Sequence, residues 1–124
     1  MTKSVNTTKF LVCLFLLILG LSDPISATTY TVLWRNLDVN LTLYPVGKQF
    51  HVGDILEFKY TPFVSAVFVV DLIGYVDCDH SRGYLADSTY SGDTFVTLNQ
   101  TGTWYFISFF EQCLTGLNLI IPVS

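Results

Sequence analysis

Alternation of apolar and polar residues marks several short strands in this chain. The stretch 55–60 (ILEFKY) alternates apolar with charged residues, which is the two-residue period of a half-buried strand. Leu56, Phe58 and Tyr60 are therefore predicted to face inward. The stretch 66–70 (AVFVV) is apolar throughout and rich in β-branched residues, which predicts a strand buried on both faces.

Further strand-like stretches are separated by turn residues. They are 30–32, 36–43 (strand or ordered loop), 50–52, 94–98, 103–108 and 117–123. Phe50 and Val52 are predicted to share one face of their strand. The segment 74–93 is rich in Gly, Ser and Asp, which predicts a long connection with at most one helical turn, and a loop is expected after Ser108. About seven short strands without helical periodicity predict an all-β sandwich or barrel.

The first residues have the pattern of a secretory leader. Lys3 and Lys9 precede an uncharged apolar run at 10–21, and the small residues Ser26 and Ala27 follow. A run of twelve apolar residues is short for a bilayer span, which needs about 20. We expect a signal peptide at 1–27, cleaved after Ala27, and one domain at 28–124; an uncleaved signal anchor is the alternative.

Charge and size narrow the functional classes. The chain has a mean hydropathy of +0.50, much of which the leader explains. Residues 28–124 hold nine acidic and four basic side chains, and this net charge of −5 argues against nucleic acid or an anionic membrane as a partner. A domain of 97 residues buries only about 60–65% of its unfolded surface, so a covalent cross-link would help to stabilise it.

The cysteines can provide that cross-link. Cys13 lies in the leader, which leaves Cys78 and Cys113 as an even pair in an oxidising compartment. A disulfide between them would close a loop worth about 3.5–4 kcal/mol in the chain-entropy model. The alternative, two free thiols or metal ligands, lacks a Cys-x-x-Cys spacing.

Two N-glycosylation sequons, beginning at Asn40 and Asn99, lie in polar, turn-rich stretches of the predicted domain. Both are expected acceptors in a secreted protein.

Other candidate chemistry is weak. His51 and His80 are predicted surface residues, with a makeshift metal site of His80 and Asp77 or Asp79 as the alternative. A calcium site from Asp77, Asp79, Asp87 and Asp93 lacks EF-hand spacing. Ser108 has no histidine predicted nearby to act as its base, so an enzyme is not expected.

The ordered motifs resemble those of the phytocyanins, plant proteins with the cupredoxin fold. The matching stretches are YTV at 30–32, GKQFHVGDILEFKY at 47–60, GYVDC at 74–78, YSGDTF at 90–95, GTWYFI at 102–107 and CLTG at 113–116. The resemblance covers nearly the whole predicted domain. It implies a cupredoxin-like Greek-key β-sandwich with one disulfide.

The copper proteins of that family bind the metal through two histidines, a cysteine and an axial methionine or glutamine, because a thiolate and two imidazoles suit blue copper. The resemblance assigns these four places to Ser65, Ser108, Gln112 and Leu117, although the interval from Ser108 to Cys113 is one residue shorter than usual. It therefore implies the copper-free, early nodulin-like branch and no cofactor.

Phe109 and Phe110 follow the aromatic strand at the end where the copper relatives carry their site. They are a candidate binding loop for a sugar ring or a partner protein. The alternative is that one or both rings fill the space left by metal and imidazoles.

The expected function is that of a secreted binding or structural module in the apoplast, the cell wall or at the outer face of the plasma membrane. Its partner would be an extracellular glycan or protein, and a monomer is expected. No Pro/Ser-rich spacer or second apolar tail follows the last predicted strand, so no membrane anchor is expected; a truncated gene product is the alternative. Electron transfer by a copper protein is the leading alternative function, and a non-functional remnant of a copper protein is a third interpretation.

Overall fold

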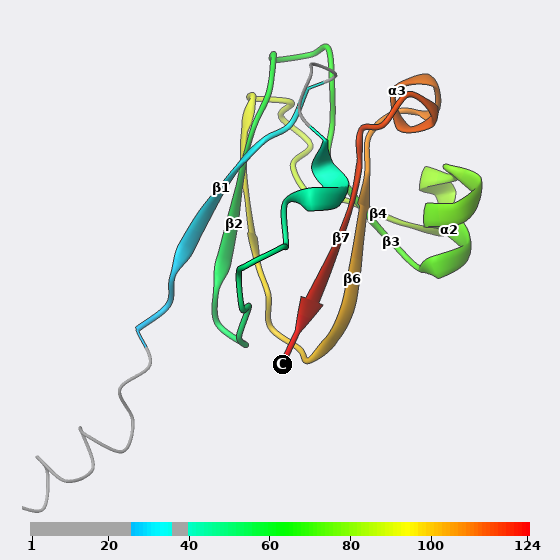
Figure 1. The fold of residues 1–124 in the computed structure, drawn as a ribbon. Helices are drawn as coiled ribbons and strands as arrows, with labels where there is room; N and C mark the ends of the chain where they lie inside the picture. Colours follow the sequence, from blue (N-terminus) through cyan, green and yellow to red (C-terminus); the bar gives the residue numbers. More distant parts are fainter. Residues whose placement is uncertain (1–25, 36–39) are drawn as a thin grey trace, which may run out of the picture.

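The computed structural model describes residues 26–35 and 40–124. Within these ranges, seven strands form two facing sheets (Figure 1). The three-stranded sheet has the order β1 (Thr29–Leu33), β2 (Ile55–Lys59), β5 (Asp93–Thr97). The four-stranded sheet has the order β4 (Gly83–Leu85), β3 (Phe68–Val70), β6 (Gly102–Ile107), β7 (Asn118–Val123). The predicted all-β sandwich is confirmed, and the predicted leader at 1–27 lies outside the described residues except for Ser26 and Ala27.

Each sheet is formed by pairing between strands that are distant in the sequence. β1 runs parallel to β2, with Thr29 opposite Ile55, and β2 runs antiparallel to β5. In the second sheet, β3 is antiparallel to both β4 and β6, and β6 is antiparallel to β7. Because β3 and β7 both run antiparallel to β6, both begin beside its last residue. The site described below lies at this end of the sheet.

The main core lies between the sheets and is rich in aromatic residues. Leu56 and Phe58 are fully buried and Tyr60 is 8% exposed, which confirms the predicted inward face of β2. The ring of Phe58 contacts Trp34 edge-on at 5.1 Å and Phe106 of β6 at 5.0 Å between ring centroids. These contacts connect the two sheets across the core.

Strand β3 is buried on both faces, as its apolar sequence predicts. Val67 and Val69 pack into the core between the sheets. The alternate residues Ala66, Phe68 and Val70 pack into a second apolar cluster on the outer face of the four-stranded sheet. Successive side chains of a strand point to opposite faces of the sheet, so residues 67 and 69 must face one cluster and residues 66, 68 and 70 the other.

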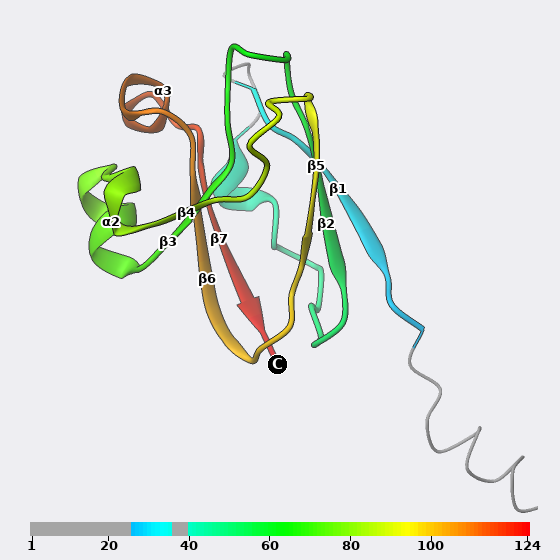
Figure 2. The same ribbon diagram turned by 180° about the vertical axis from the view of Figure 1, so that it is seen from behind.

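Two short helices cover that outer face (Figures 1 and 2). They are α2 (Leu72–Asp77) and α3 (Phe110–Leu114). Cys78, at the end of α2, is bonded to Cys113 of α3 with a Cα–Cα distance of 5.7 Å, which confirms the predicted disulfide. Both cysteines are buried in the second cluster, so the bridge holds the helices together and against the sheet.

Helix α2 begins where an aspartate satisfies its free amide groups. Asp71 accepts a hydrogen bond from the Gly74 amide at 2.8 Å, as an N-cap does, and it also pairs with Arg82 at 2.7 Å. Arg82 is the largest cause that lowers the Asp71 pKa. Helix α2 thus begins before the connection predicted at 74–93, and a short 3₁₀ helix, His80–Arg82, follows it, so the connection contains more helix than the one turn predicted.

Four details differ from the sequence predictions. Val52 does not share the inward face of Phe50, because the chain turns at 51–54 and leaves Val52 44% exposed while Phe50 is 1% exposed. The predicted strand at 50–52 is only an isolated bridge from Phe50 to Val123. The connection 74–93 contains strand β4, and the predicted loop after Ser108 contains helix α3.

Among described residues, no helix is long and apolar enough to cross a membrane.

The disulfide gives a first test of the fold. Replacement of both cysteines, Cys78→Ser and Cys113→Ser, should lower the free energy of unfolding by about 2–5 kcal/mol, because the unfolded chain regains the entropy of the open loop. Urea unfolding followed by tryptophan fluorescence measures the change, with reduced wild-type protein as the control. An unchanged unfolding midpoint would contradict the stabilising role of the bridge.

A second test concerns the tryptophan that ties β1 to the segment before β3. The buried Nε1 of Trp34 donates a hydrogen bond to the Ala66 carbonyl at 2.7 Å. Trp34→Phe should cost about 2–4 kcal/mol, because it leaves a buried carbonyl without its partner and removes packing volume. The matched control is Trp104→Phe, whose exposed bond to the Gln100 carbonyl should matter by less than about 1 kcal/mol. Equal losses in the two variants would show that burial at Trp34 is unimportant.

Candidate functional site

Ser108 is the centre of a hydrogen-bond network at the end of β6. It follows the strand directly and is completely buried. Its hydroxyl accepts a hydrogen bond from the Ala66 amide at 3.2 Å and donates one to Oε1 of Gln112. The hydroxyl therefore connects β6, the segment before β3 and helix α3.

Gln112 continues the network to the same segment. Its Nε2 donates to the Val64 carbonyl at 3.0 Å. Ser65 lies between Val64 and Ala66, both of which are bonded to the network, and is 5% exposed. We call these contacts among Val64, Ala66, Ser108 and Gln112 the Ser108 network.

Leu117 closes the arrangement through its backbone. Its amide donates to the Gln112 carbonyl at 2.9 Å, and its carbonyl accepts from the Ser108 amide at 3.2 Å. The side chain is 1% exposed and belongs to the main core. The structure thus brings together Ser65, Ser108, Gln112 and Leu117, the four positions that the sequence resemblance singled out.

The chemistry of these groups does not suit blue copper. Their side chains are hydroxyls, a carboxamide and an aliphatic group, whereas such a centre requires a thiolate and imidazoles. The described cysteines, Cys78 and Cys113, are both used in the disulfide. In the ranges 26–35 and 40–124, no group of three or more His, Cys, Asp or Glu residues is placed to hold a metal ion.

The two histidines, His51 and His80, make their contacts with residues outside the Ser108 network. Nδ1 of His51 is 3.9 Å from the Asp54 carboxylate, and the His80 ring stacks on Phe68 at 4.5 Å. The side-chain partner of the Ser108 hydroxyl is an amide, not an imidazole or a carboxylate. The arrangement therefore offers this serine no general base.

Phe109 and Phe110 have different environments, although they are adjacent in sequence. Phe109 is partly buried and packs against the second cluster, with its ring 5.7 Å from Phe68 and 6.4 Å from Tyr90 between centroids. Phe110 begins helix α3 and is 53% exposed. One ring thus fills space within the fold, and the other faces solvent.

More exposed apolar side chains lie on the segments that form the Ser108 network. Phe63 and Val64 precede Ser65, and Leu114 lies one helical turn after Phe110 on α3. We call these four residues, Phe63, Val64, Phe110 and Leu114, the apolar end. Each is more than half exposed.

The backbone next to this surface holds two residues in an unusual conformation. Phe63 and Tyr90 have positive φ angles of 63° and 51°, and the Phe63 amide donates to the Tyr90 carbonyl at 3.2 Å. Their rings are 6.3 Å apart. Positive φ costs energy in residues with large side chains and is often found at functional sites. No local sequence signal indicated either residue.

The aspartates of the connection mostly satisfy local turns. The Ser81 hydroxyl lowers the pKa of Asp79, and the Thr89 hydroxyl is the largest cause that lowers the pKa of Asp87 to about 2. Asp77, Asp79 and His80 line a shallow hollow with Phe110. The alternative metal sites drawn from Asp77, Asp79, His80, Asp87 and Asp93 gain no support, because these side chains are not grouped in threes or more around a common point among the described residues.

Both predicted sequons lie at the surface. Asn40 is exposed, and its side-chain oxygen accepts hydrogen bonds from the amide and the hydroxyl of Thr42. Asn99 is exposed after β5. Both are accessible, and glycosylation stays a prediction.

Comparisons with known proteins agree with this fold. The family model of the plastocyanin-like domain matches residues 34–117. Uclacyanin-2 of Arabidopsis thaliana is 41% identical over 111 residues, which are 87% of this chain and 53% of that protein. Early nodulin-like protein 22 of the same plant is 43% identical over 77 residues, which are 60% of this chain and 53% of that protein. The chain spans about half the length of these two relatives.

Solved structures resemble it as well. Cucumber basic protein, named as a blue copper protein, matches with a TM-score of 0.67 at 29% identity, over 78% of this chain and 100% of that one. Cucumber stellacyanin matches with a TM-score of 0.69 over 80% of this chain and 97% of that one, and its 20% identity supports the fold alone. Together with the family match and the relatives, these likenesses show that the chain belongs to the phytocyanin family of plastocyanin-like proteins.

Proposed function

We propose that this chain is a secreted, copper-free phytocyanin that acts as an extracellular binding module through its apolar end. The Ser108 network is the observation that carries the proposal. Ser108 and Gln112 bond to each other and to the backbone of residues 64 and 66, so each polar group at these positions has a partner within the protein. Such a network stabilises the fold by itself.

The loss of copper ligands argues for a function other than electron transfer. Blue copper proteins are electron carriers rather than enzymes, and their chemistry depends on a thiolate bond to the metal. Ser108 stands where the family resemblance expects that thiolate. Function is argued from the site rather than from the fold, so relatives that carry copper do not make this chain an electron carrier.

The apolar end supports a binding role. Phe63 and Phe110 are large, exposed rings on segments held by the disulfide and the Ser108 network. Exposed rings of this kind stack on sugar faces or enter pockets of partner proteins. The net charge of −5 over residues 28–124 makes nucleic acid an unsuitable partner. An extracellular glycan or protein at the plant cell wall or cell surface fits these features best.

Localisation follows the family. Phytocyanins are extracellular or cell-surface proteins of plants, and the predicted leader of this chain supports secretion. We infer that the protein acts as a monomer in the apoplast or at the outer face of the plasma membrane.

Copper loading tests the first half of the proposal. The secreted wild-type protein should retain far less than one copper per chain after desalting and show no intense thiolate-to-copper absorption, because neither a thiolate nor an imidazole stands at positions 65, 108, 112 and 117. The control variant Ser65→His/Ser108→Cys/Gln112→His should gain copper and visible colour. One tightly held copper in the wild type would refute the copper-free assignment and favour electron transfer, and a colourless variant would show that these positions are misassigned.

Binding tests the second half. Phe110→Ser should weaken binding to isolated plant cell walls or protoplasts about tenfold or more, because a central aromatic contact is often worth more than 1 kcal/mol. The matched control is Phe95→Ser, which removes an equally exposed ring from β5 of the other sheet. Both variants should unfold within about 0.5 kcal/mol of the wild type. Equal binding by all three proteins would exclude Phe110 as a contact.

A further inference from the structure

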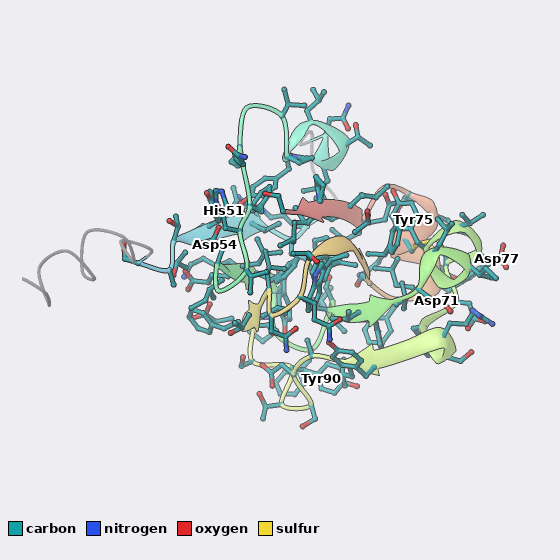
Figure 3. The ribbon with its side chains drawn as sticks, turned by 90° about the horizontal axis from the view of Figure 1, so that it is seen from below. His51, Asp54, Asp71, Tyr75, Asp77 and Tyr90 are labelled. Atoms are coloured by element: carbon teal, nitrogen blue, oxygen red, sulfur yellow. A yellow bond between two sulfur atoms is a disulfide. The ribbon has the colours of Figure 1, made fainter. Side chains whose placement is uncertain are left out.

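A buried carboxylate lies beside the beginning of the predicted mature domain. Asp54, just before β2, is 2% exposed. Its Oδ1 accepts a hydrogen bond from the Thr28 amide at 3.0 Å, and its Oδ2 accepts one from the His51 amide at 2.8 Å. Figure 3 shows His51 and Asp54 side by side, next to the strand at the N-terminal end.

This carboxylate has no strong cationic partner within the described ranges. No lysine or arginine there forms an ion pair with it, and the only charged contact is Nδ1 of His51 at 3.9 Å. The His51 side chain is half exposed, so solvent screens its interaction with the carboxylate. A buried carboxylate is costly unless it is paired with a cation and hydrogen-bonded.

The Thr28 nitrogen is the atom that cleavage of the leader would set free. Ser26 and Ala27 are exposed and lie outside any strand or helix, so the Ala27–Thr28 bond is accessible. Immediately after it, the Thr28 carbonyl accepts from the Ile55 amide at 2.9 Å and Thr29 begins the pairing of β1 with β2. The expected cleavage site thus coincides with the first ordered contact of the sheet.

We propose that Ala27–Thr28 is a processing site and that the new α-ammonium of Thr28 is the counter-charge of the buried Asp54 carboxylate. Hydrolysis consumes one water, leaves a carboxylate on Ala27 and an ammonium group on Thr28, and uses a peptidase of the secretory pathway. The nitrogen already lies 3.0 Å from Oδ1 as an amide, so the charge-assisted hydrogen bond becomes an ion pair without movement of the chain. The inference rests on the predicted leader and is independent of copper and of the apolar end.

The ion pair joins β1 to the turn before β2, which gives maturation a structural effect. In the unprocessed chain, Thr28 offers one neutral N–H, whereas the processed chain offers a positive charge. Because the attraction between opposite charges is added to a hydrogen bond that already exists, processing stabilises the edge strand of the three-stranded sheet.

The first experiment identifies the N-terminus. The full chain, with its own leader, is secreted from plant cells and analysed by intact mass and N-terminal sequencing. We expect Thr28 as the first residue. A mature protein that begins at any other residue would overturn the proposal.

The second experiment isolates the ion pair in a double-mutant cycle of secreted proteins. Insertion of one glycine between Ala27 and Thr28 moves the α-ammonium away and restores an amide at Thr28; the second change is Asp54→Asn. With Asp54 present, the insertion should raise the unfolding equilibrium constant at pH 7 about 5- to 15-fold. The reason is that the nitrogen bonded to the Asp54 carboxylate changes from an ammonium group to a neutral amide. In the Asp54→Asn background, the insertion should change the constant less than about twofold. Equal effects in the two backgrounds would overturn the ion pair.

A third measurement stands if Asp54→Asn does not fold. An α-amino group has a pKa of about 7.7–8.0 in an unfolded chain, and the Asp54 carboxylate should raise it in the folded protein. The stabilisation should therefore be complete below about pH 7.5 and disappear as the pH rises through the raised folded pKa. The stability difference between wild type and glycine insertion should vanish by about pH 10. His51, which also faces Asp54, is common to both proteins. A difference that is constant from pH 6 to pH 10 would overturn the proposal.

Discussion

Strand β3 must be covered on both faces, and much of the remaining structure depends on that constraint. Val67 and Val69 face the aromatic core between the sheets, while Phe68 and Val70 face outward. A sheet that was solvated on its outer face would expose these side chains to water. Helices α2 and α3 and the disulfide between them prevent this exposure (Figures 1 and 2). The bridge is therefore part of an apolar cluster and not merely a link between loops.

The same arrangement fixes the candidate site. Helix α3 packs beside the end of β6, and in this position Gln112 forms hydrogen bonds with the Ser108 hydroxyl and with the Val64 carbonyl, which lies before β3. Here neutral polar groups satisfy one another, and the neighbouring apolar end faces solvent. The inferred binding role follows from this division between an internally satisfied network and an exposed apolar surface.

The limits of the sequence predictions have physical causes. Val52 was wrongly placed inward because alternation assumes an extended chain, whereas the backbone turns at 51–54. Strand β4 was missed because its three residues contain Gly83 and one exposed tyrosine, so its pattern is weak, and only pairing with β3 makes it a strand. Helix α3 is too short for a helical period to be visible in its sequence. The choice between Phe109 and Phe110 as the buried ring required the positions of Phe68 and Tyr90.

The sequence by itself determined the inward face of β2, the double burial of β3, the cysteine pair and the membership of the family. These features are encoded in local side-chain periods, in the parity of cysteines and in the order of motifs. Only the tertiary structure decided which groups satisfy Ser108 and which nitrogen meets Asp54. Three of these contacts, Thr28–Asp54, Ala66–Ser108 and Val64–Gln112, join residues separated by 26 to 48 positions. No local pattern specifies such a contact, because it exists only after the strands have paired and the core has closed.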